Sequence, residues 1–149
     1  MTFTIPNPLK LEHEELHAEL VTASKAGGRV GEAANAVVKV LHEHFVKEEE
    51  FALPPLGLLA ALARDKLDED AKSVLSMTDR LKSELSEMLE EHKAIFAELE
   101  NLMAAAKAEK KPEHARFAEK LMLHAQTEEE VLYPAAILVG EYLKSKLKR

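Results

Sequence analysis

The sequence of 149 residues contains no cysteine and no tryptophan, and it has only five glycines and six prolines. Without cysteine, neither a disulfide framework nor a thiolate metal site can form, which fits a reducing compartment. No apolar run approaches the ~20 residues that span a membrane. The N-terminus also lacks the basic region and apolar run of a signal peptide. We therefore expect a soluble, cytoplasmic protein.

An excess of positive charge is also missing. The net charge is −7, and acidic and basic residues are mixed along the chain. This distribution argues against a nucleic-acid groove and against a polybasic membrane patch. The length suits a single domain over residues 1–149, with a core at about 9–135, and such a chain can bury roughly two-thirds of its unfolded surface.

Good helix formers dominate the composition, and no segment has the period-two pattern of a strand. Asn7-Pro8 reads as a helix start and Gly27-Gly28 as a helix end, while Pro54-Pro55 should stop the second helix and Pro134 should kink or end the fourth. A short apolar piece at 56–63 predicts an extra helical turn or two. The expected long helices span about Pro8–Ala26, Gly31–Leu53, Asp68–Ala108, Glu113–Tyr133 and Ala135–Leu147.

The sequence repeats itself once. HFVKEEEFALP around His44 matches HAQTEEEVLYP around His124, 80 residues later, and HEELHAEL around His13 matches HKAIFAEL around His92, 79 residues later. Two similar helical hairpins that pack together form a four-helix bundle with pseudo-two-fold symmetry. We therefore predict an all-α, up-down-up-down four-helix bundle, with a short extra helix between the second and third long helices and a C-terminal helical extension.

Each of the four helices has an apolar stripe with steps of three and four residues, and each stripe contains one histidine where a leucine is expected. The second and fourth stripes add a glutamate one turn after the histidine. The four stripes are Leu9, His13, Leu16, Leu20; Val37, Leu41, His44, Glu48, Phe51; Leu81, Leu85, Met88, His92, Ile95, Leu99; and Phe117, Leu121, His124, Glu128, Val131.

The four histidines are also equidistant from the turns between the helices, so an antiparallel bundle brings them to one height. Two buried carboxylates at that height need compensation, and no lysine or arginine lies on the inner stripes nearby. A single HxxxE is common as an exposed ion pair, but two at matched repeat positions indicate a metal site. Imidazole and carboxylate donors suit iron, manganese or zinc. The predicted ligands are His13, His44, Glu48, His92, His124 and Glu128.

Helix geometry predicts which of the neighbouring polar residues face the metal site and which face away from it. His17 lies one turn after His13 and is a candidate fifth imidazole ligand, although a partly buried polar role is the alternative. His42 is roughly 200° around the helix from His44 and should face solvent or lie outside the ligand set. By the same rule, Glu49 and Glu129 should face solvent.

At these residues the sequence resembles the hemerythrin-like, or HHE cation-binding, family. The order His, HxxxE, His, HxxxE is the family's order, and the resemblance covers about residues 9–135. It implies a bundle that binds two non-haem irons, bridged by the two carboxylates and an oxo or hydroxo group. Oxygen-carrying hemerythrins instead have HxxxH on the third helix and HxxxxD on the fourth, whereas this chain has His92 followed by Phe96, and HxxxE.

Three functions remain open at this point. The first is dioxygen binding or sensing at the iron pair. The second is a di-iron peroxidase, a catalase-like enzyme or a nitric-oxide-handling enzyme. Such an enzyme needs a proton donor, for which Tyr133 and His42 are weak candidates. Tyr133 lies five residues after Glu128 and should therefore lie off the ligand face. The third is an iron-responsive interaction module. The apolar segment Leu53–Leu62 is expected either to cover the bundle end or to form a homodimer or partner surface.

Overall fold

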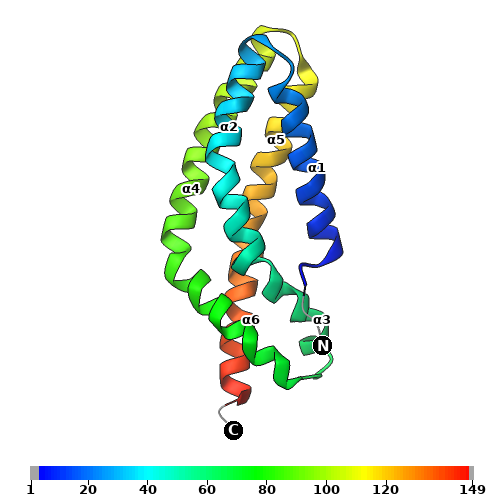
Figure 1. Cartoon of the computed structure of the whole chain (residues 1–149), viewed down its shortest axis with the longest axis vertical. Coiled ribbons are helices and arrows are strands. Elements are labelled where there is room, and N and C mark those ends of the chain that lie inside the picture. The colour runs from blue at the N-terminus through cyan, green and yellow to red at the C-terminus, as the bar shows by residue number, and fades with distance from the viewer. Residues whose placement is uncertain (1–3, 148–149) are drawn as a thin grey trace.

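The structure is a computed structural model that describes residues 4–147, and over this range it consists of helices without strands. Two hairpins stand side by side, with the turns that close them at the same end of the bundle (Figure 1). The predicted all-α four-helix bundle is confirmed. No helix within 4–147 combines the length and apolar character needed to cross a membrane. The long helices are α1 (Asn7–Ser24), α2 (Gly28–Lys47), α4 (Leu75–Ala108) and α5 (Pro112–Thr127).

The two hairpin turns support each other at this end of the bundle. Gly27 and Gly28 have φ values of +75° and +61°, a conformation that glycine adopts without steric cost. The N-terminus of α2 is capped from the other hairpin, because the backbone N–H of Val30 donates to Glu109 Oε1 at 2.9 Å. This carboxylate satisfies a donor that has no partner within the helix.

The second and fourth bundle helices both widen into a π-helical turn, where the sequence predicts continuous α-helix. These turns are η1 (Glu48–Ala52) and η4 (Glu128–Leu132). Leu53 N–H donates to the Glu48 carbonyl, and Tyr133 N–H donates to the Glu128 carbonyl, each across five residues. A π-turn brings residue i+5 onto the face of residue i, so each turn changes which side chains point inward.

The two hairpins diverge after these turns. Two consecutive prolines, Pro54 and Pro55, remove two successive N–H donors, and α2 is followed by η2 (Pro54–Leu58), α3 (Leu59–Ala63) and η3 (Glu69–Val74). Pro134 does not end the second hairpin, because α6 (Tyr133–Leu147) continues directly from η4 beyond the bundle (Figure 1). The extra helical turns and the C-terminal extension therefore occur as predicted.

The apolar segment after α2 covers the end of the bundle. Leu53, Leu56 and Leu58 are at most 2% exposed and belong to the apolar core. Covering was one of the two predicted roles of Leu53–Leu62, and the burial of these leucines agrees with it.

The residues of the predicted inner stripes are buried, apart from Leu9 and Leu85, which are partly buried, and Val131, which is exposed. Val131 is 56% exposed, whereas its repeat counterpart Phe51 is 1% exposed. The prediction for Val131 was wrong because it assumed α-helical spacing through η4. The buried apolar residues form three clusters. One lies toward the hairpin turns and another lies around Phe51, Leu81 and Met88, with the histidines and glutamates between these two, and the third includes Leu58 and Leu143.

Close packing of α6 on α4 gives a stability test. A Cβ atom at Gly140 would overlap the Thr78 hydroxyl, so Gly140→Val should destabilise the fold by about 1–3 kcal/mol through overpacking. The free energy of unfolding in urea measures this effect. Ser145→Val, at an exposed position of the same helix, controls for helix propensity, and an equal effect of both substitutions would contradict the packing argument.

Candidate metal centre

The structure brings all six predicted ligands into one buried layer. Each histidine comes from a different long helix, and each glutamate is the first residue of a π-turn. All six residues are at most 5% exposed. The imidazole centroids of His13 and His124 are 5.1 Å apart, and those of His44 and His92 are 4.5 Å apart. The histidines therefore lie at one height, as the sequence predicts.

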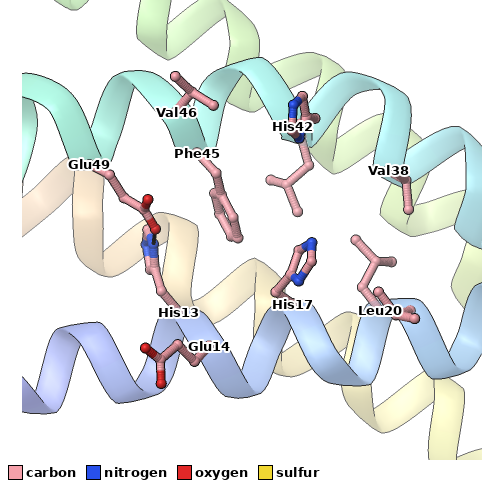
Figure 2. Close-up of a pocket in the computed structure, with 11 residues that line it drawn as sticks. His13, Glu14, His17, Leu20, Val38, His42, Phe45, Val46 and Glu49 are labelled. Atoms are coloured by element: carbon pink, nitrogen blue, oxygen red, sulfur yellow. Dashed lines mark ion pairs between the residues drawn. The ribbon is translucent and has the colours of Figure 1, made fainter.

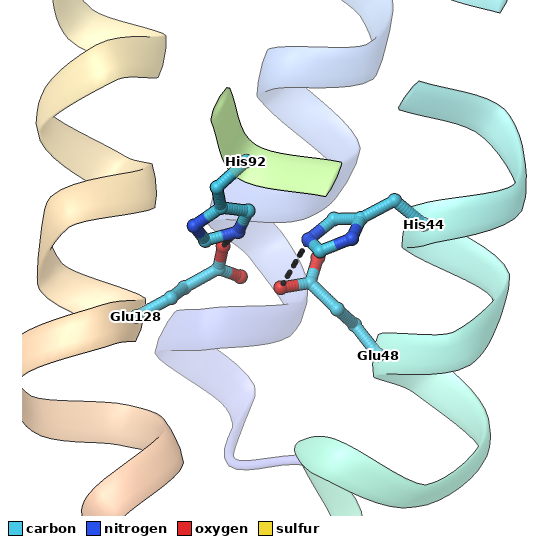
Figure 3. Close-up of side chains that lie close together, drawn as sticks. All are labelled: His44, Glu48, His92 and Glu128. Carbon is cyan, nitrogen blue, oxygen red and sulfur yellow. Dashed lines mark ion pairs between the residues drawn. The ribbon is translucent and has the colours of Figure 1, made fainter. Parts of the chain in front are cut away.

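These side chains form two potential ion sites that share a residue. In each group the possible ligand atoms lie within 4.8 Å of one another. Figure 3 shows the first group converging from α2, α4 and the two π-turns. The groups are His44, Glu48, His92 and Glu128; and His13, His124 and Glu128.

Glu128 spans both groups with its two oxygens. Its Oε1 lies 3.3 Å from His92 Nε2. Its Oε2 lies 3.1 Å from His124 Nε2 and 3.5 Å from His13 Nε2. The carboxylate thus offers one oxygen to each pair of histidines.

Glu48 spans the groups in the same way from the opposite hairpin. Its Oε1 lies 3.5 Å from His13 Nε2, and its Oε2 lies 3.5 Å from His44 Nε2. Each carboxylate thus directs one oxygen toward each pair of histidines. This is the arrangement expected of two carboxylates that bridge a pair of metal ions.

An outer set of carboxylates orients the imidazoles. In three histidines Nδ1–H donates to a carboxylate on a neighbouring helix, which leaves Nε2 to face the centre. Such carboxylate–histidine pairs fix the ring and raise the basicity of a metal ligand. These pairs were not predicted from the sequence, and the prediction that Glu129 faces solvent was wrong, because its side chain is only 31% exposed. The pairs are His44 with Glu91 at 2.8 Å, His92 with Glu129 at 2.9 Å, and His124 with Glu12.

His13 is the exception to this pattern. Its Nδ1 is buried without a hydrogen-bond partner, and the nearest carboxylate, Glu49, lies 3.8 Å away and is 58% exposed. Glu48 Oε1 and His124 Nε2 are also buried without a partner, and both border the centre. A buried unpaired polar atom costs about 1–3 kcal/mol. Cations between the imidazoles and carboxylates would satisfy the two atoms at the centre, so the residues fit a metal pair.

Without metal, protons hold this cluster together. Burial alone would lower the pKa of His44, but the hydrogen bond and charge of Glu48, with Glu91, raise it to about 9. Burial would likewise lower the pKa of His124, but the hydrogen bond and the negative charge of Glu128 outweigh burial and raise this pKa to about 9. Burial and the negative charge of Glu128 raise the pKa of Glu48 to about 7. Burial would also raise the pKa of Glu128, but its contacts with Glu48 and with the neighbouring histidines hold this pKa well below its usual range.

Tyr133 also points into the centre, contrary to the prediction that it lies off the ligand face. It is fully buried, and its hydroxyl donates a short hydrogen bond to Glu48 Oε2. The hydroxyl oxygen also lies 3.1 Å from His44 Nε2 and 3.2 Å from His92 Nε2. The π-turn is the reason, because Tyr133 is the fifth residue after Glu128 and returns to its face. Pro54 and Pro134, each six residues after a glutamate ligand, were the signal that could have indicated both turns.

A pocket of about 300 Å³ reaches the centre from one side, between α1 and α2. His13 forms part of its wall, and the ring of Phe45 stacks on His13 with centroids 4.4 Å apart. His17 from α1 and His42 from α2 line the pocket on its two sides (Figure 2). Both are exposed, and within the described residues His17 belongs to neither ligand group.

Comparison with known proteins agrees with this arrangement. The model of the hemerythrin HHE cation binding domain matches residues 4–136, which is most of the chain. The chain belongs to the hemerythrin HHE cation-binding family. The matched residues include both hairpins and all six predicted ligands. No curated protein and no solved structure matches the chain.

The protonation of the cluster predicts how the metal-free protein responds to pH. In the folded chain, the pKa values of His44 and His124 lie at about 9, above the ordinary 6.5. Their protonation therefore stabilises the fold fully below pH 6.5, and this contribution is lost as the pH rises toward 9. We expect the melting temperature of chelator-treated protein to fall by several degrees over that range.

Metal-loaded protein is the control for this measurement. Metal binding requires neutral imidazoles, so a rise in pH favours loading, and the loaded protein should lack the fall in melting temperature. A melting temperature of the metal-free protein that rises between pH 6.5 and 9 would contradict the proposed proton network.

Proposed function

We propose that this chain is a non-haem di-iron protein that binds dioxygen at a carboxylate-bridged iron pair. The observation that carries the proposal is the placement of Glu48 and Glu128, each with one oxygen toward each pair of histidines. The ligands would be His13 and His124 at one iron and His44 and His92 at the other, with both glutamates shared.

The donor types and the family support iron. Imidazole and carboxylate suit iron, manganese and zinc, and the resemblance to hemerythrins favours iron with an oxo or hydroxo bridge. When bound, an iron pair supplies the reversible electron transfer that dioxygen binding needs. The chain itself orients the imidazoles through outer carboxylates and surrounds the centre with apolar layers. These layers exclude water, which strengthens electrostatic interactions within the site and limits side reactions.

A second candidate function is supported by specific observations. An enzyme that handles peroxide or nitric oxide needs an accessible site and a proton donor. The pocket beside His13 supplies access, and the Tyr133 hydroxyl lies among the ligands.

The iron content and visible spectrum of the purified protein, followed through anaerobic reduction and the return of air, separate the two functions. About two irons with a reversible charge-transfer band support dioxygen binding; two irons that only oxidise favour the enzyme.

The assignment of the bridging ligands can be tested directly. Replacing both shared carboxylates, as Glu48→Gln with Glu128→Gln, should reduce bound iron from about two ions per chain to less than one, because the amides carry no charge. Metal analysis after loading with ferrous iron measures this. The matched control is Glu50→Gln with Glu130→Gln, at exposed positions of the same two runs. Two irons retained by the first variant would show that these residues do not bridge.

If the pocket is the access route to the metal centre, narrowing it should slow the binding of a small ligand. Val46 lines the pocket and is 42% exposed, so Val46→Trp should narrow the opening without overpacking the core. We expect azide, used as a probe of the oxidised iron pair, to bind several-fold more slowly in stopped-flow absorbance. Leu123→Trp, at a 64% exposed site outside the pocket, is the control, and equal rates in both variants would exclude this route.

A further inference from the structure

Tyr133 places a phenolic oxygen inside the predicted metal centre, in addition to the six predicted ligands. The oxygen is within hydrogen-bond distance of three possible ligand atoms, namely His44 Nε2, His92 Nε2 and Glu48 Oε2. The three residues that carry these atoms belong to the same potential ion site. The hydroxyl therefore lies within the first group, rather than beside it.

The spacing of these atoms matches that of ligands around a shared ion. Two ligand atoms that are each about 2.1 Å from one ion, at right angles, lie about 3 Å apart. Tyr133 Oη lies 3.1 and 3.2 Å from the two imidazole nitrogens. The other neighbours in the group have similar separations, with 3.5 Å between His44 and Glu48 and 3.3 Å between His92 and Glu128.

We propose that Tyr133 is a fifth protein ligand, through its phenolate oxygen, of the ion held by His44, His92, Glu48 and Glu128. On binding, the phenolic O–H bond breaks, the proton leaves to solvent and an oxygen–metal bond forms, with no transfer of electrons. The positive charge of the ion compensates the phenolate. This inference rests on the proposed iron pair and adds a residue to one half of it.

Within the part of the chain that the structure describes, the second ion site has no such additional ligand. The repeat counterpart of Tyr133 is Leu53, which is buried and has no donor atom. Among residues 4–147, the donors of the His13–His124 group are therefore its two imidazoles and Glu128, with Glu48 Oε1 lying 3.5 Å from His13 Nε2. It also borders the pocket, which contains His13 in its wall. An ion held there would have fewer protein ligands than the ion beside Tyr133, so a small exogenous ligand would bind at the His13–His124 ion.

The chain allows a clear spectroscopic test, because Tyr133 and Tyr142 are its two tyrosines. A phenolate bound to ferric iron gives a visible charge-transfer band, and excitation in that band enhances the ring vibrations in resonance Raman spectra. Protein loaded with ferrous iron and oxidised in air should show both signals. Tyr133→Phe should lose them, and Tyr142→Phe, at a 39% exposed position, should keep them. Phenolate signals that persist in Tyr133→Phe would overturn the inference.

Iron analysis separates this inference from the proposed function. Two irons per chain without phenolate vibrations overturn the Tyr133 ligand and leave the iron pair standing. Phenolate vibrations with a single iron support the ligand and contradict the pair, while a chain that takes up no iron overturns both. If Tyr133→Phe fails to fold by circular dichroism, the Tyr142→Phe protein decides alone, because Tyr133 is then its sole tyrosine.

Azide tests which ion is open. Saturating azide should leave the phenolate vibrations of the oxidised protein in place, because azide binds at the other ion. Loss of the phenolate vibrations on addition of azide would show that azide replaces Tyr133, and would overturn the assignment of the open site.

Discussion

Two carboxylates held against each other in an apolar interior are the constraint on which the rest of this structure depends. Glu48 and Glu128 are at most 1% exposed, and water does not solvate their charges. Four imidazoles surround them and supply the compensation that burial requires. Protons on the imidazoles can provide it without metal, and cations can provide it with metal. The same cluster is therefore costly to bury in a metal-free bundle and well suited to binding cations.

The sequence predicts the bundle and the six central residues because both depend on one helical period. Leucine stripes and histidines at steps of three and four are visible within each helix alone. Predictions from the sequence fail where this helical period changes. At η4 the extra residue in the turn moves Tyr133 inward and Val131 outward, and a pattern based on α-helical spacing assigns both to the wrong face.

The outer carboxylates could not be predicted for a different reason. Glu12 and Glu91 each precede a histidine in the sequence, but each pairs with a histidine on another helix. Such pairs depend on which helices are neighbours and on their relative heights. Neither property follows from the pattern of a single helix. The pocket between α1 and α2 likewise depends on how two helices pack, so only the structure could reveal it.

The division of the ion sites between the hairpins has a consequence for biosynthesis. The first hairpin supplies His13, His44 and Glu48, and the second supplies His92, His124 and Glu128. Each potential ion site combines residues from both. During translation, neither site exists until residue 128 has left the ribosome and the second hairpin has docked. The nascent first hairpin therefore cannot assemble either site ahead of time, and a metal ion could be captured only by a chain whose two halves have already come together.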